Sequence, residues 1–174
     1  MNFSKKILIQ KKKISNNNQP FIIAEIGSNF NQNLKLAKKM INTAKKCGAD
    51  AVKFQLFKAD ILYPKIKDKK MNKLFKSIEL KTSWAKELKE YSDKLGIIFF
   101  ASAFDLKSAK FLEKINVKVH KVASSELTNF KLINFLAKTK KPLLLSTGMS
   151  DMDDIKNALK ICNLKKNFDV VVMQ

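Results

Sequence analysis

The segment "KKCGADAVKFQ", residues 45–55, contains the predicted end of a helix, followed at once by a short strand. Gly48 stands where a helix commonly ends on a left-handed residue, a conformation that glycine adopts without a steric penalty. The strand "AVKFQ" is mostly apolar but carries Lys53 and Gln55 near its end. One apolar helix face precedes Gly48, at Leu34, Ala37, Ile41 and Ala44. The segment therefore predicts one helix–strand unit of an α/β fold.

The same unit recurs along the chain as an amphipathic helix, a stop signal and a short apolar strand. The further helices are predicted at residues 83–95, 106–115, 131–139 and around 155–162. The strands after them are "IIFFAS" (97–102), "VHKVASSE" (119–126), "LLLSTG" (143–148) and "DVVVM" (169–173). With "FIIAE" (21–25) as the first, six strands are predicted. They must run parallel, because each crossover returns the chain to the same edge of the sheet.

Two architectures fit this alternation, an open doubly wound sheet and part of a (β/α)8 barrel. The turn after the first strand lacks the Gly-x-Gly-x-x-Gly pattern of dinucleotide-binding folds, which weakens the first option. The segment "KKILIQKKKIS" (5–15) is typical of a small two-stranded flap. We therefore predict an incomplete (β/α)8 TIM barrel of about six βα units, preceded by a small N-terminal β-hairpin.

The charge of the chain raises the possibility of a nucleic-acid partner. The formal net charge is +20, but all 35 basic residues are lysine and none is arginine, the residue that grips phosphate in bidentate fashion. The lysines are also spread over nearly every predicted helix, as expected of a solvated surface. We therefore expect no nucleic-acid partner, and a basic binding module remains an alternative.

The length and the absence of membrane signals suggest the compartment. A chain of 174 residues can bury a sizeable core and most simply forms one domain. It has no apolar run of about 18 residues and no signal-peptide pattern, so we expect a cytoplasmic protein without membrane contact. Cys47 and Cys162 each lie alone in helical segments, as is typical of reduced thiols.

Polar side chains gather at the ends of the predicted strands, where the strands of a barrel converge on one mouth. The set consists of Glu25, Lys53, Gln55, Ser102, Lys121, Ser124, Ser125, Glu126, Ser146 and Thr147. Lysines can neutralise a phosphate or carboxylate, hydroxyls complete the cage, and a carboxylate remains for proton transfer. The mixture suits a phosphorylated anion bound beside a polar, sugar-like partner.

Each of these residues also has a simpler interpretation. Lys53 and Lys121 would be surface lysines whose stems lie along apolar surface. Glu25 would cap the next helix, and Ser124 and Ser125 would be turn residues.

Two other polar groups are better explained by structure than by function. His120 is the only histidine, and without a second ligand it is more simply a hydrogen-bonded strand residue than part of a metal site. Asp151, Asp153 and Asp154 open a predicted helix, where acidic groups stabilise the N-terminus.

Four segments carry a resemblance to a known family: "AEIGSN" (24–29), "GADAVKFQ" (48–55), "KVASSELTN" (121–129) and "KPLLLSTGM" (141–149). In this order and spacing they resemble the N-acetylneuraminate (sialic acid) synthase family, which includes legionaminic and pseudaminic acid synthases. The likeness runs from about residue 20 to residue 174 and corresponds to the N-terminal part of the barrel.

The resemblance implies an enzyme of sialic acid and surface polysaccharide biosynthesis. Members of the family join phosphoenolpyruvate to an N-acylated hexosamine such as N-acetylmannosamine, using a divalent metal (Mn or Mg), and release phosphate. They are homodimers whose barrel is followed by an antifreeze-like domain, which is absent from residues 1–174 here. No metal ligand is expected in this chain.

The resemblance also implies a role for each matching residue. Glu25 would be the catalytic acid or base, and Glu126 and Gln55 would bind the sugar. Phosphoenolpyruvate would be bound by Lys53, Ser102, Lys121, Ser124 and Ser146.

Several features depart from the family pattern. Phe30 and Gln32 stand where the family usually has a histidine and a second glycine, and Ser102–Ala103 replaces a Thr-Pro pair. The segment between the second and third strands looks short. A complete barrel needs about 250 residues, so we expect a fragment, a truncated product or half of a split enzyme, inactive by itself.

A different enzyme class also fits the lysines. In a Schiff-base aldolase of the TIM-barrel type, Lys53 or Lys121 would attack a substrate carbonyl.

Overall fold

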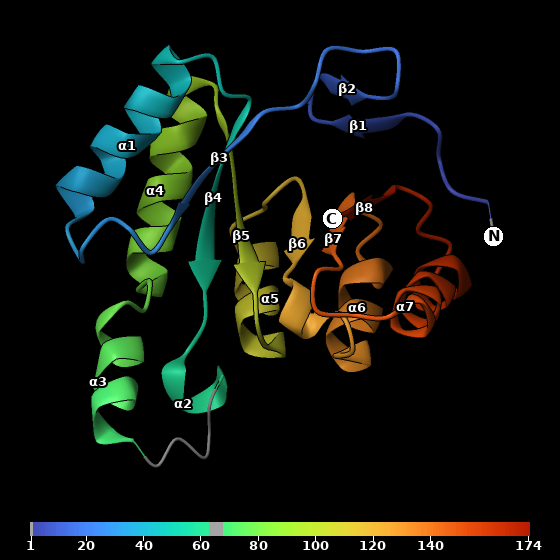
Figure 1. The fold of residues 1–174 in the computed structure, drawn as a ribbon. Coiled ribbons are helices and arrows are strands. Elements are labelled where there is room, and N and C mark those ends of the chain that lie inside the picture. The colour runs from blue at the N-terminus through green and yellow to red at the C-terminus, as the bar shows by residue number, and fades with distance from the viewer. Residues whose placement is uncertain (1, 63–67) are drawn as a thin grey trace.

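The computed structural model describes residues 2–62 and 68–174. A hairpin of two antiparallel strands comes first, β1 (Ile7–Ile9) and β2 (Lys12–Ile14), as predicted. In the described residues a sheet of six parallel strands follows (Figure 1). These are β3 (Ile23–Gly27), β4 (Ala51–Leu56), β5 (Ile98–Ala103), β6 (His120–Val122), β7 (Leu143–Ser146) and β8 (Val170–Met173).

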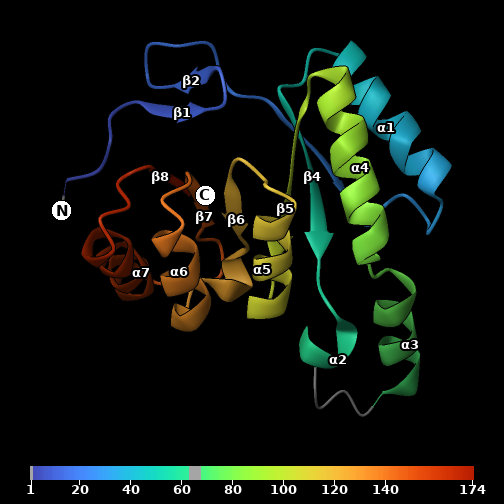
Figure 2. The ribbon, with the colours of Figure 1, turned by 180° about the vertical axis from the view of Figure 1, so that it is seen from behind.

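The strand order distinguishes the two predicted architectures. Each strand pairs with the next one along the chain, in the order β3-β4-β5-β6-β7-β8. A doubly wound sheet reverses direction at a switch point, whereas a barrel adds every strand on the same side. The sheet therefore has the sequential winding of an incomplete (β/α)8 barrel, and it curls accordingly (Figures 1 and 2).

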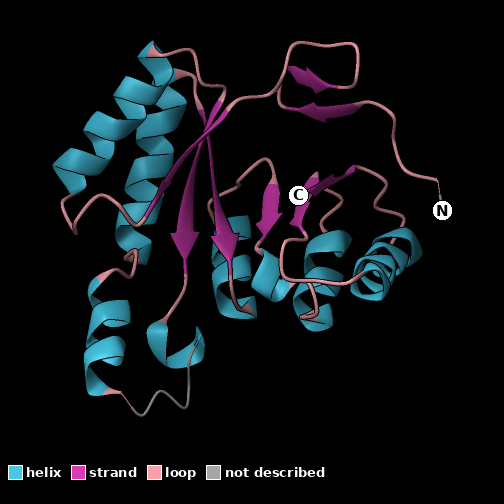
Figure 3. Cartoon of the chain, in the orientation of Figure 1, coloured by secondary structure: helices cyan, strands magenta, loops and turns pink. Residues whose placement is uncertain are grey.

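Helices cross between the strands, as Figure 3 shows by secondary structure. They are α1 (Leu34–Lys46), α2 (Ala59–Leu62), α3 (Lys69–Ser77), α4 (Thr82–Leu95), α5 (Leu106–Lys114), η1 (Ser124–Glu126, a 3-10 turn), α6 (Phe130–Lys138) and α7 (Met152–Leu164). The five helices expected from the sequence are confirmed, with bounds that differ by a few residues. The turn η1 and helices α2 and α3 were not predicted. Both helices lie between β4 and β5, in the segment that looks short in the sequence. Residues 63–67 of this segment lie outside the described part.

The predicted stop signals adopt the conformation that ends a helix. Gly48 follows α1 with φ +85°, and Gly96 follows α4 with φ +65°. Asn116, after α5, has φ +58°. At the start of α7, Asp151 accepts hydrogen bonds from the backbone N–H groups of Asp153 and Asp154, so the predicted helix cap is confirmed.

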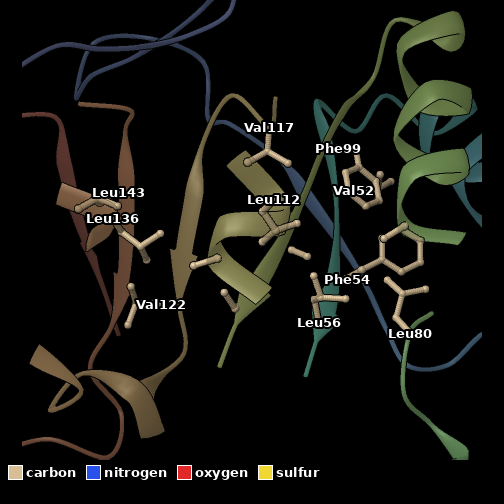
Figure 4. Close-up of a cluster of buried hydrophobic side chains, with 14 of the residues drawn as sticks. Val52, Phe54, Leu56, Leu80, Phe99, Leu112, Val117, Val122, Leu136 and Leu143 are labelled. Atoms are coloured by element: carbon tan, nitrogen blue, oxygen red, sulfur yellow. The ribbon is translucent and has the colours of Figure 1, made fainter. Parts of the chain in front are cut away.

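The main core lies between the sheet and the helices. Figure 4 shows alternate residues of β4, Val52, Phe54 and Leu56, beside Leu80 and Leu112. Side chains on a strand alternate between its two faces, so the residues between these three on β4 point to the opposite face of the sheet. The buried apolar residues of α1, α4, α5, α6 and α7 pack on the first side, which makes the opposite side the interior of the curled sheet.

The hairpin closes one end of this interior. Ile7 and Ile9 are buried against Ala51, Ile98 and Phe100, which face inward from β4 and β5. The hairpin therefore covers the N-terminal ends of the strands, while α2 and α3 lie at the C-terminal ends (Figure 1). The interior is sealed by apolar packing at its base, and its polar residues lie near the other end.

Two sequence expectations concern the chain as a whole. The thiols of Cys47 and Cys162 are both free, as predicted, and burial raises the pKa of the Cys162 thiol to about 11. Among the described residues, no helix is long and apolar enough to cross a membrane.

Candidate functional site

The inner face of the sheet changes from apolar to polar along the strands. Ala51 on β4 and Phe100 on β5 belong to the apolar base. Two positions further along each strand, the same face carries Lys53, then Gln55, and Ser102. The period of two that builds the strands therefore also brings the polar side chains to one end of the interior.

These side chains line a cavity of about 360 Å³, here called the strand-end cavity. It brings together Glu25, Lys53, Gln55, Ser102, Lys121, Ser124 and Ser146, with Ile23, Ala123 and Met173 completing the wall. Of the polar strand-end residues predicted from the sequence, Ser125, Glu126 and Thr147 do not line this cavity: Glu126 lies in a neighbouring pocket, Ser125 is exposed, and the Thr147 hydroxyl donates to the carbonyl of Met173 at 3.1 Å. Sequence reasoning missed the three apolar or small wall residues. Ile23 and Met173 could have been found, because they lie on the inward-facing alternation of β3 and β8.

Lys53 is held between a carboxylate and a hydroxyl. Its Nζ lies 2.7 Å from Oε2 of Glu25 and donates a hydrogen bond to Oγ of Ser102 at 3.2 Å. Only 12% of the Lys53 side chain is exposed, so it is not a surface lysine. The parallel register of β3 and β4 sets Glu25 opposite Lys53 and explains the ion pair.

Lys121 is the more deeply buried cation. Its Nζ donates hydrogen bonds to Oγ of Ser146 at 2.5 Å and to the carbonyl of Val122 at 2.7 Å. Burial and then the neighbouring Lys53 cation lower the pKa of the Lys121 ammonium from 10.5 to about 8, against the opposing effect of Glu25. The surface interpretation of Lys121 is therefore also wrong.

Glu25 does not cap the next helix. That role belongs to Asn33, whose side chain accepts a hydrogen bond from the N–H of Leu36 at 3.0 Å. The pairing of β3 with β4 shifts register between Glu25 and Gly27, and Gly27 has φ +58°. A Cβ at Gly27 would lie 3.3 Å from Oε1 of Glu25. Glycine here therefore leaves room for the carboxylate.

Glu126 lies in the pocket next to the strand-end cavity. This second pocket, also about 360 Å³, is lined by Ile61, Leu62, Phe104, Asp105, Leu106, Glu126, Asn129 and Lys131. The three residues of the turn η1 point in different directions. Ser124 lines the strand-end cavity and Ser125 is exposed. Glu126 accepts a hydrogen bond from Asn129 at 2.9 Å. The alternative interpretation of both serines as simple turn residues therefore does not account for the position of Ser124 in the cavity wall.

His120 is a satisfied strand residue. It is buried, and its Nε2 lies 2.7 Å from Oε1 of Glu113. No group of three or more His, Cys, Asp or Glu side chains that could hold a metal ion occurs within the part of the chain described. At the strand ends, Glu25 is already paired with Lys53. The described residues therefore do not provide a complete set of ligands for a divalent metal.

A larger cavity, of about 510 Å³, lies at the opposite end of the strands. Lys11, Lys12 and Lys13 line it, but the side chain of Lys12 is 60% exposed and already pairs with Asp50 at 2.6 Å. The lysines of this groove beside the hairpin are exposed, whereas those of the smaller strand-end cavity are largely removed from solvent.

Two residues that depart from the family pattern have structural roles. Phe30 is fully buried, with its ring centroid 6.0 Å from that of Phe54 and 6.5 Å from that of Trp84. It therefore belongs to the helix-side core. Gln32 donates a hydrogen bond from Nε2 to the carbonyl of Glu79 at 2.9 Å.

Comparison with known proteins places this geometry in a family. The sequence matches the NeuB family over residues 40–174, which is more than half of the chain. An uncharacterized protein of Methanocaldococcus jannaschii is 40% identical over 168 residues, covering 97% of this chain and 49% of that protein. The N,N'-diacetyllegionaminic acid synthase of Legionella pneumophila is 41% identical over 151 residues, covering 80% of this chain and 42% of the synthase.

The fold agrees with that of solved structures. The N-acetylneuraminic acid (sialic acid) synthetase of Leptospira borgpetersenii superposes with a TM-score of 0.90 at 33% identity, covering 98% of this chain and 59% of that one. The chain spans about half the length of the curated relatives it matches. The family match, the relatives and the shared fold lead to the same conclusion: the chain belongs to the NeuB family.

Proposed function

We propose that the chain supplies the phosphoenolpyruvate-binding part of a synthase that condenses phosphoenolpyruvate with an N-acylated hexosamine to form a nonulosonic acid, releasing phosphate. The observation that carries the proposal is the pairing of two poorly exposed lysines, Lys53 and Lys121, in one cavity with three serines. Against these two cations the cavity sets one carboxylate, Glu25, so a positive charge remains for an anion.

Each lining residue has a role in this proposal. The ammonium groups of Lys53 and Lys121 bind the phosphate and carboxylate of phosphoenolpyruvate. Their present hydroxyl partners, Ser102 and Ser146, hold them in place and donate to the ligand. Ser124 adds a third hydroxyl from η1. Because the serines hold both cations in the ligand-free chain, little reorganisation is needed on binding.

In the proposed reaction, Glu25 is the residue that transfers protons. C3 of phosphoenolpyruvate forms a bond to the aldehyde carbon of the open-chain sugar, while C2 becomes cationic and takes up water. Glu25 stabilises the cationic C2 and accepts a proton from that water, and the proton passes to the alkoxide made from the aldehyde. Breaking the bond between C2 and the phosphate oxygen then releases phosphate, which takes up the proton of the C2 hydroxyl, and leaves the keto acid.

The acceptor sugar is proposed to lie on the outer side of the anion. Gln55 reaches the strand-end cavity from the end of β4, and Glu126 lines the adjacent pocket. A neutral, polyhydroxylated molecule with an N-acyl group suits this mixture of amide, carboxylate and apolar wall. Relatives that are named as legionaminic, pseudaminic and N-acetylneuraminate-9-phosphate synthases support an amino-sugar acceptor.

The complete enzyme is proposed to need parts outside residues 1–174. These are further barrel strands, the ligands of a divalent metal (Mn or Mg) and an antifreeze-like domain, in a cytoplasmic homodimer. Within the described residues, β3 and β8 each pair with one strand of the main sheet, so the barrel is not closed by these strands. Because the closing strands and the metal ligands are proposed to lie outside residues 1–174, we expect no phosphate release when the chain alone is mixed with phosphoenolpyruvate and N-acetylmannosamine. Turnover would contradict this expectation.

Calorimetric titration tests the binding proposal directly. We expect phosphoenolpyruvate to bind the wild-type chain, and Lys53→Ala or Lys121→Ala each to weaken its affinity by about tenfold or more. Lys38→Ala is the matched control, because it removes the same charge from an ion pair with Glu87 on the helix side. Absence of wild-type binding, or an equal loss in Lys38→Ala, would refute the proposal.

A second candidate, a Schiff-base aldolase, is favoured by one observation. Burial and the Lys53 cation bring the pKa of Lys121 to about 8, so a larger fraction of this amine than of an ordinary lysine is neutral and nucleophilic near neutral pH. Borohydride reduction in the presence of pyruvate separates the two functions. A stable adduct on Lys121 or Lys53, identified by mass spectrometry, would support the aldolase, and the synthase proposal predicts none.

A further inference from the structure

Glu79, between α3 and α4, joins three segments at the C-terminal end of the sheet. Its Oε1 accepts a hydrogen bond from the N–H of Ala59 at 2.6 Å, and its Oε2 lies 2.7 Å from Nζ of Lys58. Its backbone carbonyl accepts the hydrogen bond from Gln32 at 2.9 Å. The carboxylate of Glu79 thus fixes the loop after β4, and its backbone carbonyl contacts the turn after β3.

The turn after β3 needs such support. Asn31 and Gln32 have φ values of +48° and +50°, a left-handed conformation that costs a side-chain-bearing residue roughly 1 kcal/mol or more. Two consecutive residues in this conformation persist only when their surroundings hold them. The hydrogen bond from Gln32 to Glu79 is a contact that holds this turn.

The loop after β4 is fixed at a second point by aromatic packing. The ring centroid of Phe57 lies 6.4 Å from that of Phe75 on α3 and 5.8 Å from that of Phe104 after β5. Phe57 is buried, and Lys58 and Ala59 follow it directly. The residues directly after β4 are therefore held by the ring of Phe57 and by the Glu79 carboxylate.

Both fixed segments continue strands that line the strand-end cavity. The turn held through Gln32 begins just after Glu25 and Gly27, and the loop held through Lys58 begins just after Lys53 and Gln55. Glu25 and Lys53 form the ion pair at 2.7 Å. A contact that holds both strand ends also holds these partners in register.

We propose that Glu79 is a positioning residue for the strand-end cavity, keeping the ends of β3 and β4 in their binding arrangement before phosphoenolpyruvate arrives. This inference rests on the proposed function for its ligand. Without the Glu79 carboxylate, binding would also have to order the loop after β4, which the carboxylate holds at Lys58 and Ala59, and that cost would appear as lost affinity. Glu79 itself does not line the cavity.

The first test is amide hydrogen exchange without ligand. We expect Glu79→Ala to speed exchange by about tenfold or more in the loop at Ile61, whose N–H is hydrogen-bonded to the carbonyl of Lys58. The turn at Asn29 and Asn33 should change less, because its contact is with the Glu79 backbone carbonyl, which the substitution keeps. Glu79→Gln should exchange more slowly than Glu79→Ala, because its amide oxygen still accepts from Ala59. Unchanged exchange in Glu79→Ala would overturn the proposal.

The second test is the affinity for phosphoenolpyruvate under conditions where every variant is fully folded. We expect Glu79→Ala to weaken binding by about tenfold and Glu79→Gln by less. The control is Glu87→Ala, which removes a similar ion pair, with Lys38 at 2.6 Å, between α4 and α1. Equal losses in Glu87→Ala, or full affinity in Glu79→Ala, would overturn the positioning role.

The two tests separate this inference from the function on which it rests. If the wild-type chain does not bind phosphoenolpyruvate, the proposed function fails, while the exchange rates still decide whether the Glu79 carboxylate holds the loop after β4. If the wild type binds and Glu79→Ala binds equally well, the function stands and the positioning role fails.

Discussion

The ammonium group of Lys121 lies where water is largely excluded, and only 6% of the residue is exposed. Burial and the Lys53 cation lower its pKa to about 8, within reach of physiological pH. In the ligand-free chain, burial and the Lys53 cation therefore raise the free energy of the charged form of Lys121 above that of an exposed lysine. A bound anion favours that charged form, so ligand binding and protonation of Lys121 are coupled.

This coupling predicts the pH dependence of binding. As pH rises through about 8, Lys121 loses its proton in the free chain, and the affinity for phosphoenolpyruvate should fall towards about pH 9.5. Lys121→Met should bind weakly and show a flatter profile over the same range. Titration calorimetry in two buffers with different ionisation enthalpies would detect proton uptake by the wild type. A pH-independent affinity in the wild type would contradict the account.

Gly27 offers a test of how Glu25 is positioned. In Gly27→Ala the new Cβ would lie 3.3 Å from Oε1 of Glu25, at a φ of +58°. The matched control is Gly48→Ala, also at positive φ but with no atom within 4 Å of its Cβ. Each change should cost about 1 kcal/mol of unfolding free energy through the backbone.

The two glycine variants should differ in their effect on the cavity. Only Gly27→Ala should alter the affinity for phosphoenolpyruvate, because only there does the added methyl press on a lining side chain. Chemical denaturation and calorimetry give the two quantities. Equal affinities in the two variants would show that Gly27 serves the backbone alone.

At the scale of elements, Glu113 on α5 connects two strands. Its Oε1 lies 2.7 Å from Nε2 of His120 on β6 and 2.6 Å from Nζ of Lys141, just before β7. Burial raises the pKa of Glu113, but the hydrogen bonds and charges of His120 and Lys141 outweigh it and leave the pKa below 4.5. The carboxylate therefore stabilises the fold above about pH 4.5, and this contribution is lost as pH falls through the lowered pKa.

Glu113→Gln should show this dependence as a difference from the wild type. It should lower the unfolding free energy at about pH 6.5, and the difference from the wild type should have narrowed at about pH 3, because falling pH protonates the wild-type carboxylate. Urea denaturation at the two pH values measures the difference. A gap that stays constant between them would contradict the assignment.

The start of α7 offers a second element-scale prediction. Asp151 accepts two backbone N–H groups, and Asp154 accepts the N–H of Asp151 in return. Asp151→Ala should therefore cost about 1 kcal/mol of unfolding free energy. Asp153→Ala removes only an exposed ion pair with Lys156 and should cost a few tenths at most. Similar losses in the two variants, measured by denaturant unfolding, would count against the cap.

The elements that the sequence predicts are those coded locally. Gly48 and Gly96 mark helix ends, and the inward residues of each strand follow a period of two, so the βα units and the polar strand ends could be predicted. Helix α3 also had a local signal that was overlooked, with Asp68 as its cap and apolar residues at positions 71, 74, 75 and 78. Helix α2 had none, because its single turn is capped by Glu79 from 20 residues away.

The same distinction applies to the strand-end cavity. Lys53 and Lys121 could be placed at the mouth because the strand ends are predictable. The ion pair of Lys53 with Glu25 depends on the register of β3 against β4, and the contact of Gln32 with Glu79 spans 47 residues. Contacts of this kind follow from tertiary packing, which local patterns do not encode.

At the scale of the whole molecule, charge and shape act together. The net charge of +20 is spread over the surface, where salt screens it, but the two cations of the strand-end cavity are buried and screened far less. The apolar base beneath them and the hairpin that covers it exclude water from one side. An anion that enters from the C-terminal ends of the strands therefore meets a focused positive field.

A crystal structure of the chain grown with phosphoenolpyruvate tests the central claim most directly. The account predicts the ligand in the strand-end cavity, with its anionic oxygens at about 2.7–3.2 Å from Nζ of Lys53 and Lys121 and from the serine hydroxyls. Phosphoenolpyruvate bound instead in the lysine-lined groove beside the hairpin, or an empty strand-end cavity at saturating ligand, would contradict it.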